Sequence, residues 1–151
     1  MGARAVIKPN QSIRAGALIG IGFVAAIDEI IFHQILGWHH FYDKSTPVVG
    51  LISDGLLHSA ELIALVAGFY GLYSAHLSQL LRTPLMFAGV LFGMGGFQLF
   101  DGIINHKILR LHQIRYDVNL FFYDSLWCLL AILLLLSGYW VKYKYHKNAR
   151  D

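Results

Sequence analysis

A chain of 151 residues with 56% hydrophobic and only 14% charged residues departs from soluble domains, which carry about 25% charged residues. This composition excludes an ordinary soluble domain and favours a membrane protein. The net charge of +3 comes from scattered basic residues and gives no nucleic-acid signal, and the single cysteine, Cys128, excludes an intramolecular disulfide framework.

Four apolar segments follow one another along the chain, and each is long enough to cross a bilayer, for which about 20 helical residues are needed. They lie at about 13–36, 54–73, 84–108 and 119–141. The sequence therefore predicts an all-α fold: an integral membrane four-helix bundle that forms a single transmembrane domain over residues 1–151.

Basic residues are distributed unevenly between the two ends of these helices. Eight Lys and Arg residues lie on the side of the termini and four lie on the other side. Because Lys and Arg are enriched in cytoplasmic segments, we expect both termini to be cytoplasmic. The first group is Arg4, Lys8, Arg14, Arg82, Lys142, Lys144, Lys147 and Arg150, and the second is Lys44, Lys107, Arg110 and Arg115.

The first and third segments are copies of one another. When residues 15–39 are aligned with 88–112, 12 of 25 positions are identical on an offset of 73 residues. Both copies enter the membrane in the same direction, which predicts two parallel helix hairpins, about 13–75 and 84–141, with a shared site at their interface. The matched pairs include Asp28 with Asp101, His33 with His106, and His39 with His112.

The second helices of the two hairpins match less well. Asp54 and Glu61 align with Asp117 and Asp124 on an offset of 63 residues, which predicts that the first connecting loop is ten residues longer than the second. Asp54 and Asp117 would then open their helices, where aspartate is a favourable cap. We therefore interpret both as caps before ligands.

Ionisable side chains concentrate in the outer half of the predicted bundle. Such residues are costly at membrane depth and usually mark a functional site. Because only Lys107 offers a basic side chain at the same depth, the crowded carboxylates and imidazoles predict a bound transition metal, with iron or copper favoured and zinc as an alternative. Glu29 shares this depth but is not among the predicted ligands. The predicted metal residues are His33, His58, Glu61, Asp101, His106 and Asp124, with Asp28 orienting a histidine or binding the ion.

The step from Asp28 to His33, repeated from Asp101 to His106, spans five residues. Five residues of α-helix turn through about 140°, so both side chains cannot point at one atom. Either one of them binds the ion while the other orients it, or the helix contains a π-bulge.

Simpler explanations compete at several positions. Four histidines near the membrane surface are interpreted as solvated rim residues before ligands: His39, His40, His76 and His112. For the duplicated Asp-to-His steps, the main alternative is a buried Asp–His hydrogen bond without a metal.

The combined pattern Asp28…His33…Trp38-His39-His40, Asp54-Gly-Leu-Leu-His58 and Asp101-Gly-Ile-Ile-Asn-His106…His112 resembles that of a family of small bacterial membrane proteins catalogued as a domain of unknown function. The resemblance covers nearly the whole chain. It implies four spans in a bacterial inner membrane and brings no established activity. A His-His pair after the third helix is typical of the family, and here Gln113 stands at its second position.

Four functions are compatible with these residues. The first is a metal-dependent oxidoreductase with an iron or copper centre, and the second is metal delivery or assembly for a respiratory oxidase, whose components would be partners. The third is a b-type haem protein with His33 and His106 as axial ligands, in which the surplus carboxylates have no use. The fourth is a proton path through Asp28, Glu61 and Asp101. The lipid bilayer is the expected surrounding, and a homo-oligomer is left open.

Overall fold

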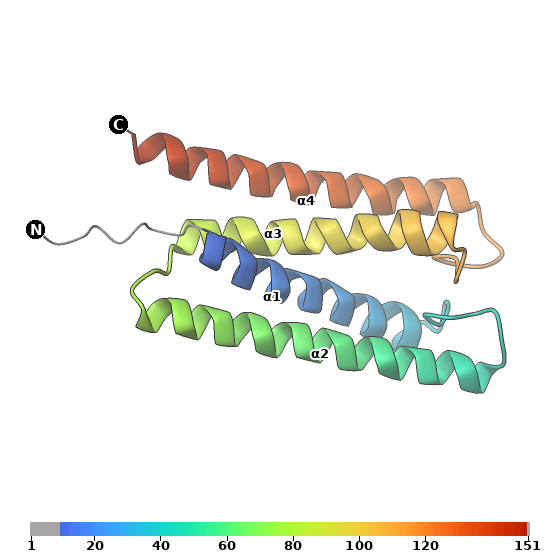
Figure 1. Cartoon of the computed structure of the whole chain (residues 1–151). Coiled ribbons are helices and arrows are strands. Elements are labelled where there is room, and N and C mark those ends of the chain that lie inside the picture. The colour runs from blue at the N-terminus through green and yellow to red at the C-terminus, as the bar shows by residue number, and fades with distance from the viewer. Residues whose placement is uncertain (1–9, 151) are drawn as a thin grey trace, which may run out of the picture.

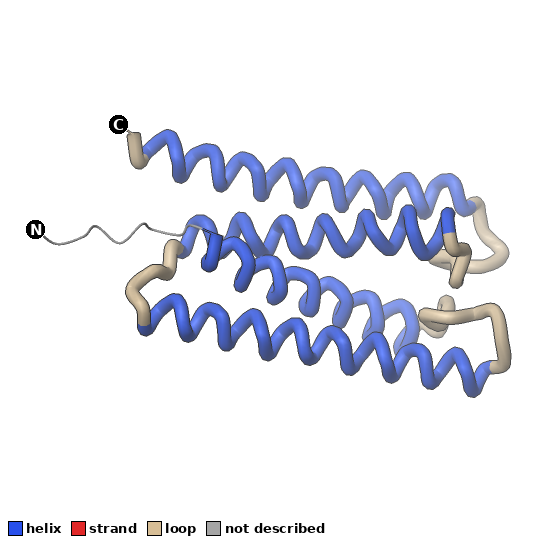
Figure 2. Tube along the Cα trace, in the orientation of Figure 1, coloured by secondary structure: helices blue, strands red, loops and turns tan. Residues whose placement is uncertain are grey.

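The computed structural model describes residues 10–150, which form long helices joined by loops (Figure 1). The loops are confined to the turns between helices (Figure 2), and the predicted all-α fold is confirmed. Arg4 and Lys8, used to predict the orientation, lie outside the described residues. The elements in chain order are α1 (Asn10–Asp28), the π-helix η1 (Glu29–Ile35), α2 (Pro47–Leu77), α3 (Thr83–Phe100), the π-helix η2 (Asp101–Ile108) and α4 (Leu120–Asn148).

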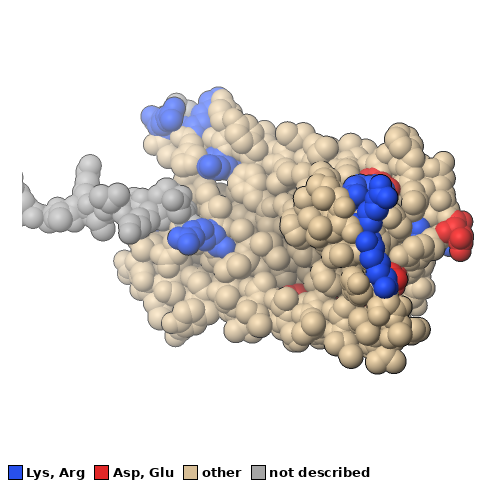
Figure 3. Space-filling view, turned by 45° about the vertical axis from the view of Figure 1, so that its right-hand side comes forward, with Lys and Arg blue, Asp and Glu red and all other residues tan. Residues whose placement is uncertain are grey.

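Four helical stretches are long and apolar enough to cross a membrane: Gln11–Ile35, Pro47–Leu77, Thr83–Ile108 and Leu120–Asn148. The start of α1 and the end of α4 lie at the same end of the molecule (Figure 1). On the face in Figure 3, charged side chains gather towards the two ends and the middle is almost free of them. This distribution is the one expected of a surface that lies in lipid.

The helices are arranged in the order α2–α1–α3–α4 (Figure 1). The central pair is α1 and α3, and α2 packs on α1 while α4 packs on α3. Within residues 10–150, α2 and α4 do not contact each other. Both outer helices therefore leave a wide apolar surface uncovered, which suits contact with lipid chains.

Glycines allow α1 and α3 to cross closely. A methyl group at Gly20 would collide with the carbonyl oxygen of Val90, and one at Gly93 would collide with that of Ala17. These contacts are reciprocal, because each pair is related by the 73-residue offset, and Gly16 and Gly89 repeat the pattern one turn away. Small residues at this spacing permit the close approach of helices in a membrane.

The second helices correspond on an offset of 70 residues, and the predicted offset of 63 is wrong. Gly68 packs on Ala15, and Gly138 packs on the matching Ala88. The partner of His33 on α2 is Asp54, and the partner of His106 on α4 is Asp124. Asp124 therefore corresponds to Asp54, and Glu61 corresponds to Ala131. The connecting loops 36–46 and 109–119 are equal in length, so the predicted difference of ten residues is wrong, and the offset changes by three because α2 begins about one turn further ahead of Asp54 than α4 does of Asp124.

The two aspartates interpreted as helix caps do not cap helices. Thr46 precedes α2, and its side chain accepts a hydrogen bond from the backbone amide of Val49, so Asp54 lies two turns inside the helix. Asp117 lies in the loop before α4 with a φ of +57°, and Asn119 is the residue that precedes that helix.

The loops 36–46 and 109–119 are tied together at one end of the molecule, which we call the loop end. The amide of Asp43 donates to the carbonyl of Leu111 at 3.0 Å, and Nζ of Lys44 donates to the carbonyl of Leu109 at 2.9 Å. These bonds join the two hairpins directly above the polar ends of α1 and α3.

Candidate metal centre

Two π-helical segments position the duplicated acids and imidazoles. The amide of Leu36 donates to the carbonyl of Ile31 at 2.9 Å, and that of Leu109 donates to Ile104 at 2.7 Å. Hydrogen bonds that span five residues bring side chains five positions apart to the same face. Of the two arrangements left open by the sequence, the structure contains the π-helix, and His33 accordingly faces Asp28.

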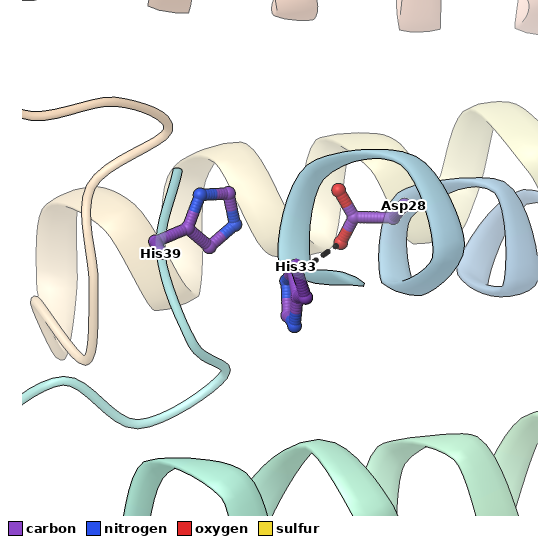
Figure 4. Close-up of side chains that lie close together, drawn as sticks. All are labelled: Asp28, His33 and His39. Carbon is purple, nitrogen blue, oxygen red and sulfur yellow. Dashed lines mark ion pairs between the residues drawn. The ribbon is translucent and has the colours of Figure 1, made fainter. Parts of the chain in front are cut away.

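Asp28, His33 and His39 form the first buried group, in which one ligand atom of each lies within 4.8 Å of the others (Figure 4). Nε2 of His33 is 3.6 Å from Oδ2 of Asp28, and the rings of His33 and His39 are 4.4 Å apart. His39 comes from the loop, where Gly37 adopts a φ of +56°. This left-handed conformation is open to glycine without steric cost, and it turns the chain back over η1.

Asp101, His106 and His112 form the matching group in the second hairpin, again with one ligand atom of each within 4.8 Å of the others. Nε2 of His106 is 3.0 Å from Oδ2 of Asp101, and the rings of His106 and His112 are 4.7 Å apart. The side-chain amide of Asn105 donates to Oδ1 of Asp101 at 2.9 Å and holds that carboxylate in place.

The two groups meet on the axis that relates the hairpins. The rings of His39 and His112 are stacked, with centroids 4.6 Å apart and planes 5° from parallel. The distances between ring centroids of the two groups also match, since the ring of His33 lies 6.1 Å from that of His112 and the ring of His39 lies 6.4 Å from that of His106. We call these six residues the central cluster: Asp28, His33, His39, Asp101, His106 and His112.

Within residues 10–150, several nitrogen atoms of the central cluster are buried without a hydrogen-bond partner. They include both ring nitrogens of His39, both of His106, and Nε2 of His33 and His112. Buried polar atoms in native proteins are nearly always satisfied. Nitrogen lone pairs that face one another and two carboxylates are the donors that a metal ion requires.

The protonation of the loop histidines also suits metal binding. Nδ1 of His112 lies 2.8 Å from the carbonyl oxygen of Phe41 and donates to it, which leaves Nε2 as a lone pair on the side of Asp101. Burial lowers the pKa of His112. Burial, reinforced by His112 and His33, lowers the pKa of His39 to about 2. Both rings are therefore neutral at pH 7, which is the form that binds metals.

His39 and His112 are buried, so their interpretation as solvated rim residues is wrong. They are 5% and 2% exposed, because each loop folds back over its π-helix. His40 is partly exposed and places Nδ1 2.5 Å from Oδ2 of Asp54. The sequence did carry a signal for the first two, because His39 and His112 match across the repeat.

His58, Glu61 and Asp124 lie beside the central cluster. Oε1 of Glu61 is buried 2.5 Å from Nδ1 of His58, whose side chain is half exposed. Asp124 approaches Nδ1 of His106 to 3.5 Å and pairs with Lys107. In the part of the chain that the structure describes, none of the three belongs to a group with three ligand atoms within 4.8 Å.

Glu29 and Asp54, which are absent from the predicted ligands, form a third such group with His33. Nδ1 of His33 hydrogen-bonds Oδ1 of Asp54 at 3.0 Å. Oε2 of Glu29 lies 2.9 Å from the same nitrogen without forming a hydrogen bond. We call Glu29, Asp54, His58 and Glu61 the lateral cluster, because they line the side of the central cluster that faces α2.

Four apolar helices around a buried cluster of imidazoles and carboxylates define an integral membrane protein with a candidate metal centre. A family model described as "Predicted membrane protein (DUF2243)" matches residues 15–145, which contain every residue of both clusters. The chain belongs to this family, whose function is unknown. No curated protein and no solved structure matches the chain.

Proposed function

We propose that this membrane protein binds a transition metal, iron or copper, in the central cluster, and that the bound metal serves a redox reaction. The observation that carries the proposal is His39, whose two ring nitrogens are buried between the rings of His33 and His112 without a hydrogen-bond partner among the described residues. Ring nitrogens that make no hydrogen bond within residues 10–150 are available as ligands for a metal ion.

The charge of the central cluster supports a cation. The central cluster contains two carboxyl groups, and within residues 10–150 neither Asp28 nor Asp101 pairs with Lys or Arg. A buried carboxylate without a counter-charge costs several kcal/mol. A divalent ion between the two groups would neutralise both.

The donor set favours iron among the candidate metals. Each group offers two histidines and one carboxylate, which is the set that non-haem iron oxygenases use while keeping positions open for substrates. A pocket of about 380 Å³ at the loop end is lined in part by His39 and would give a small reactant access to the ion.

The same pocket favours metal delivery as a second candidate function. Asp43 and His40 line it together with His39, so three potential ligands lead from the surface to the central cluster. A delivery protein needs such a path for the ion itself, whereas an enzyme needs it for a substrate.

Elemental analysis of the full chain, purified in detergent from cells supplied with iron and copper, tests the proposal. His39→Ala should lose the metal of the central cluster and bind less iron or copper than wild type, while His76→Ala, a matched control on the exposed side of α2, should bind the wild-type amount. Wild-type protein without metal would refute the proposal. A Soret band would identify a haem protein instead, and a metal that passes to a chelator without changing oxidation state would select delivery.

A further inference from the structure

The two hairpins differ in charge beside the central cluster. The offset of 73 pairs Gln34 with Lys107, and the offset of 70 pairs Asp54 with Asp124. The first hairpin has two further acids, Glu29 and Glu61, where the second has Gly102 and Ala131. One hairpin therefore presents three carboxylates at a place where the other presents one carboxylate and one lysine.

The second hairpin balances its own charge. Nζ of Lys107 pairs with Asp124, whose side chain is only 10% exposed. The lysine extends from η2 across to α4, so the positive charge comes from within the chain. This hairpin needs no external cation at the position.

The first hairpin has no such balance. Glu29, Asp54 and Glu61 are each at most 2% exposed, and within residues 10–150 none of them pairs with Lys or Arg. Gln34 stands in the place of Lys107 and gives Glu29 only a neutral amide, at 2.7 Å. In the described part of the chain, one oxygen of Glu29 and one of Glu61 are buried without a hydrogen-bond partner.

We propose that the lateral cluster is a second divalent-cation site, present only in the first hairpin. The ion there would supply the positive charge that the Lys107 ammonium supplies in the second hairpin. Oxygens of Glu29 and Asp54 lie within 4.8 Å of each other, and the Glu61–His58 pair lies on the adjoining turns of α2. Three carboxylates and one imidazole form an oxygen-rich set, which suits Mn²⁺ or Fe²⁺ better than copper.

His33 separates the two sites. Its Nδ1 donates to Asp54 in the lateral cluster, which leaves Nε2 as a lone pair for the central cluster. Orientation of His33 does not explain Glu61, because in the described chain Glu61 forms no ion pair with the His33 ring. The lateral site does not rest on the proposed function, and either site can fail alone.

The test counts Mn²⁺ bound per chain by equilibrium dialysis and by the loss of the free-ion signal in electron paramagnetic resonance. Gln34→Lys places an ammonium where the second hairpin already has one, so it should bind one Mn²⁺ fewer than wild type. Gln34→Met, of similar size but uncharged, should keep the wild-type number. Both substitutions are at an exposed position, and gel filtration verifies folding.

Glu61→Gln provides an independent measurement and should weaken the lateral Mn²⁺ at least tenfold. In a His39→Ala background, which removes the central site, the lateral Mn²⁺ should remain and should disappear when Gln34→Lys is added. The proposal is overturned if that background binds no Mn²⁺, or if Gln34→Lys binds as many ions as Gln34→Met. Failure of the central site has a different signature, because His39→Ala would then bind as much metal as wild type.

Discussion

Gly93→Ala tests whether the close crossing of α1 and α3 holds the molecule together. The added methyl carbon would overlap the carbonyl oxygen of Ala17 and lie 2.8 Å and 2.9 Å from its carbonyl carbon and Cα. These are backbone atoms that no side-chain rotation can move. Ordinary carbon contacts begin at about 3.5 Å, so the two helices must separate by roughly 1 Å.

The expected loss follows from two opposing terms. Overpacking in a well-packed interface costs about 1–3 kcal/mol, and exchanging glycine for alanine within a helix returns up to about 1 kcal/mol. Gly96→Ala is the matched control, because a methyl group there meets nothing within 4 Å. The difference between the two variants is therefore the overpacking term, about 2 kcal/mol, or roughly thirtyfold in the folding equilibrium.

Unfolding by increasing mole fractions of sodium dodecyl sulfate in mixed micelles, followed by circular dichroism, measures this difference. Gly93→Ala should unfold at a lower mole fraction than Gly96→Ala, and Gly20→Ala should match Gly93→Ala because its contact with Val90 is the reciprocal one. Equal stability of Gly93→Ala and Gly96→Ala would refute the reasoning. Unequal losses for Gly20→Ala and Gly93→Ala would show that the two contacts are not equivalent.

Three further predictions concern the loop end. Lys107→Met leaves the buried carboxylate of Asp124 without its ion-pair partner and should cost about 1–3 kcal/mol, which the same unfolding assay measures. Arg115→Ala removes a guanidinium 4.7 Å from the Trp38 ring, so it should cost about 1 kcal/mol or less and change the tryptophan emission. Partial burial and the neighbouring Asp43 raise the pKa of Tyr116 to about 12, so ionisation disfavours the folded state between about pH 10 and 12. Ultraviolet titration against Tyr116→Phe should show that midpoint and should show it falling in Asp43→Asn.

The fold could be predicted further than the site because the two depend on different signals. Apolar runs long enough to cross a bilayer identify α1, α2, α3 and α4, and the glycine spacing indicates which helices cross closely. The alignment of Asp54 with Asp117 was misleading because both were interpreted as caps. Because α2 begins at Pro47, Asp54 lies inside the helix. The residue that caps the helix is Thr46 and not the aspartate.

The composition of the central cluster depends on loops, and residue spacing constrains loops weakly. Distance along a helix predicts that His39 lies near the membrane surface, whereas the turn at Gly37 brings it back onto His33. The five-residue step from Asp28 to His33 allowed two backbone geometries, and only the structure distinguishes them. Lys107 was the one basic residue expected at site depth, and it pairs with Asp124.

The stacked rings of His39 and His112 have a consequence for the origin of the molecule. Each hairpin contributes one of the two stacked rings. A single ancestral hairpin would therefore have completed the central cluster only by pairing with an identical copy. Within one chain the two halves can differ, and the acids present on only one flank are a difference that an assembly of two identical chains could not carry. Separately expressed hairpins should accordingly be unable to complete the central cluster alone and should complete it when they are produced together.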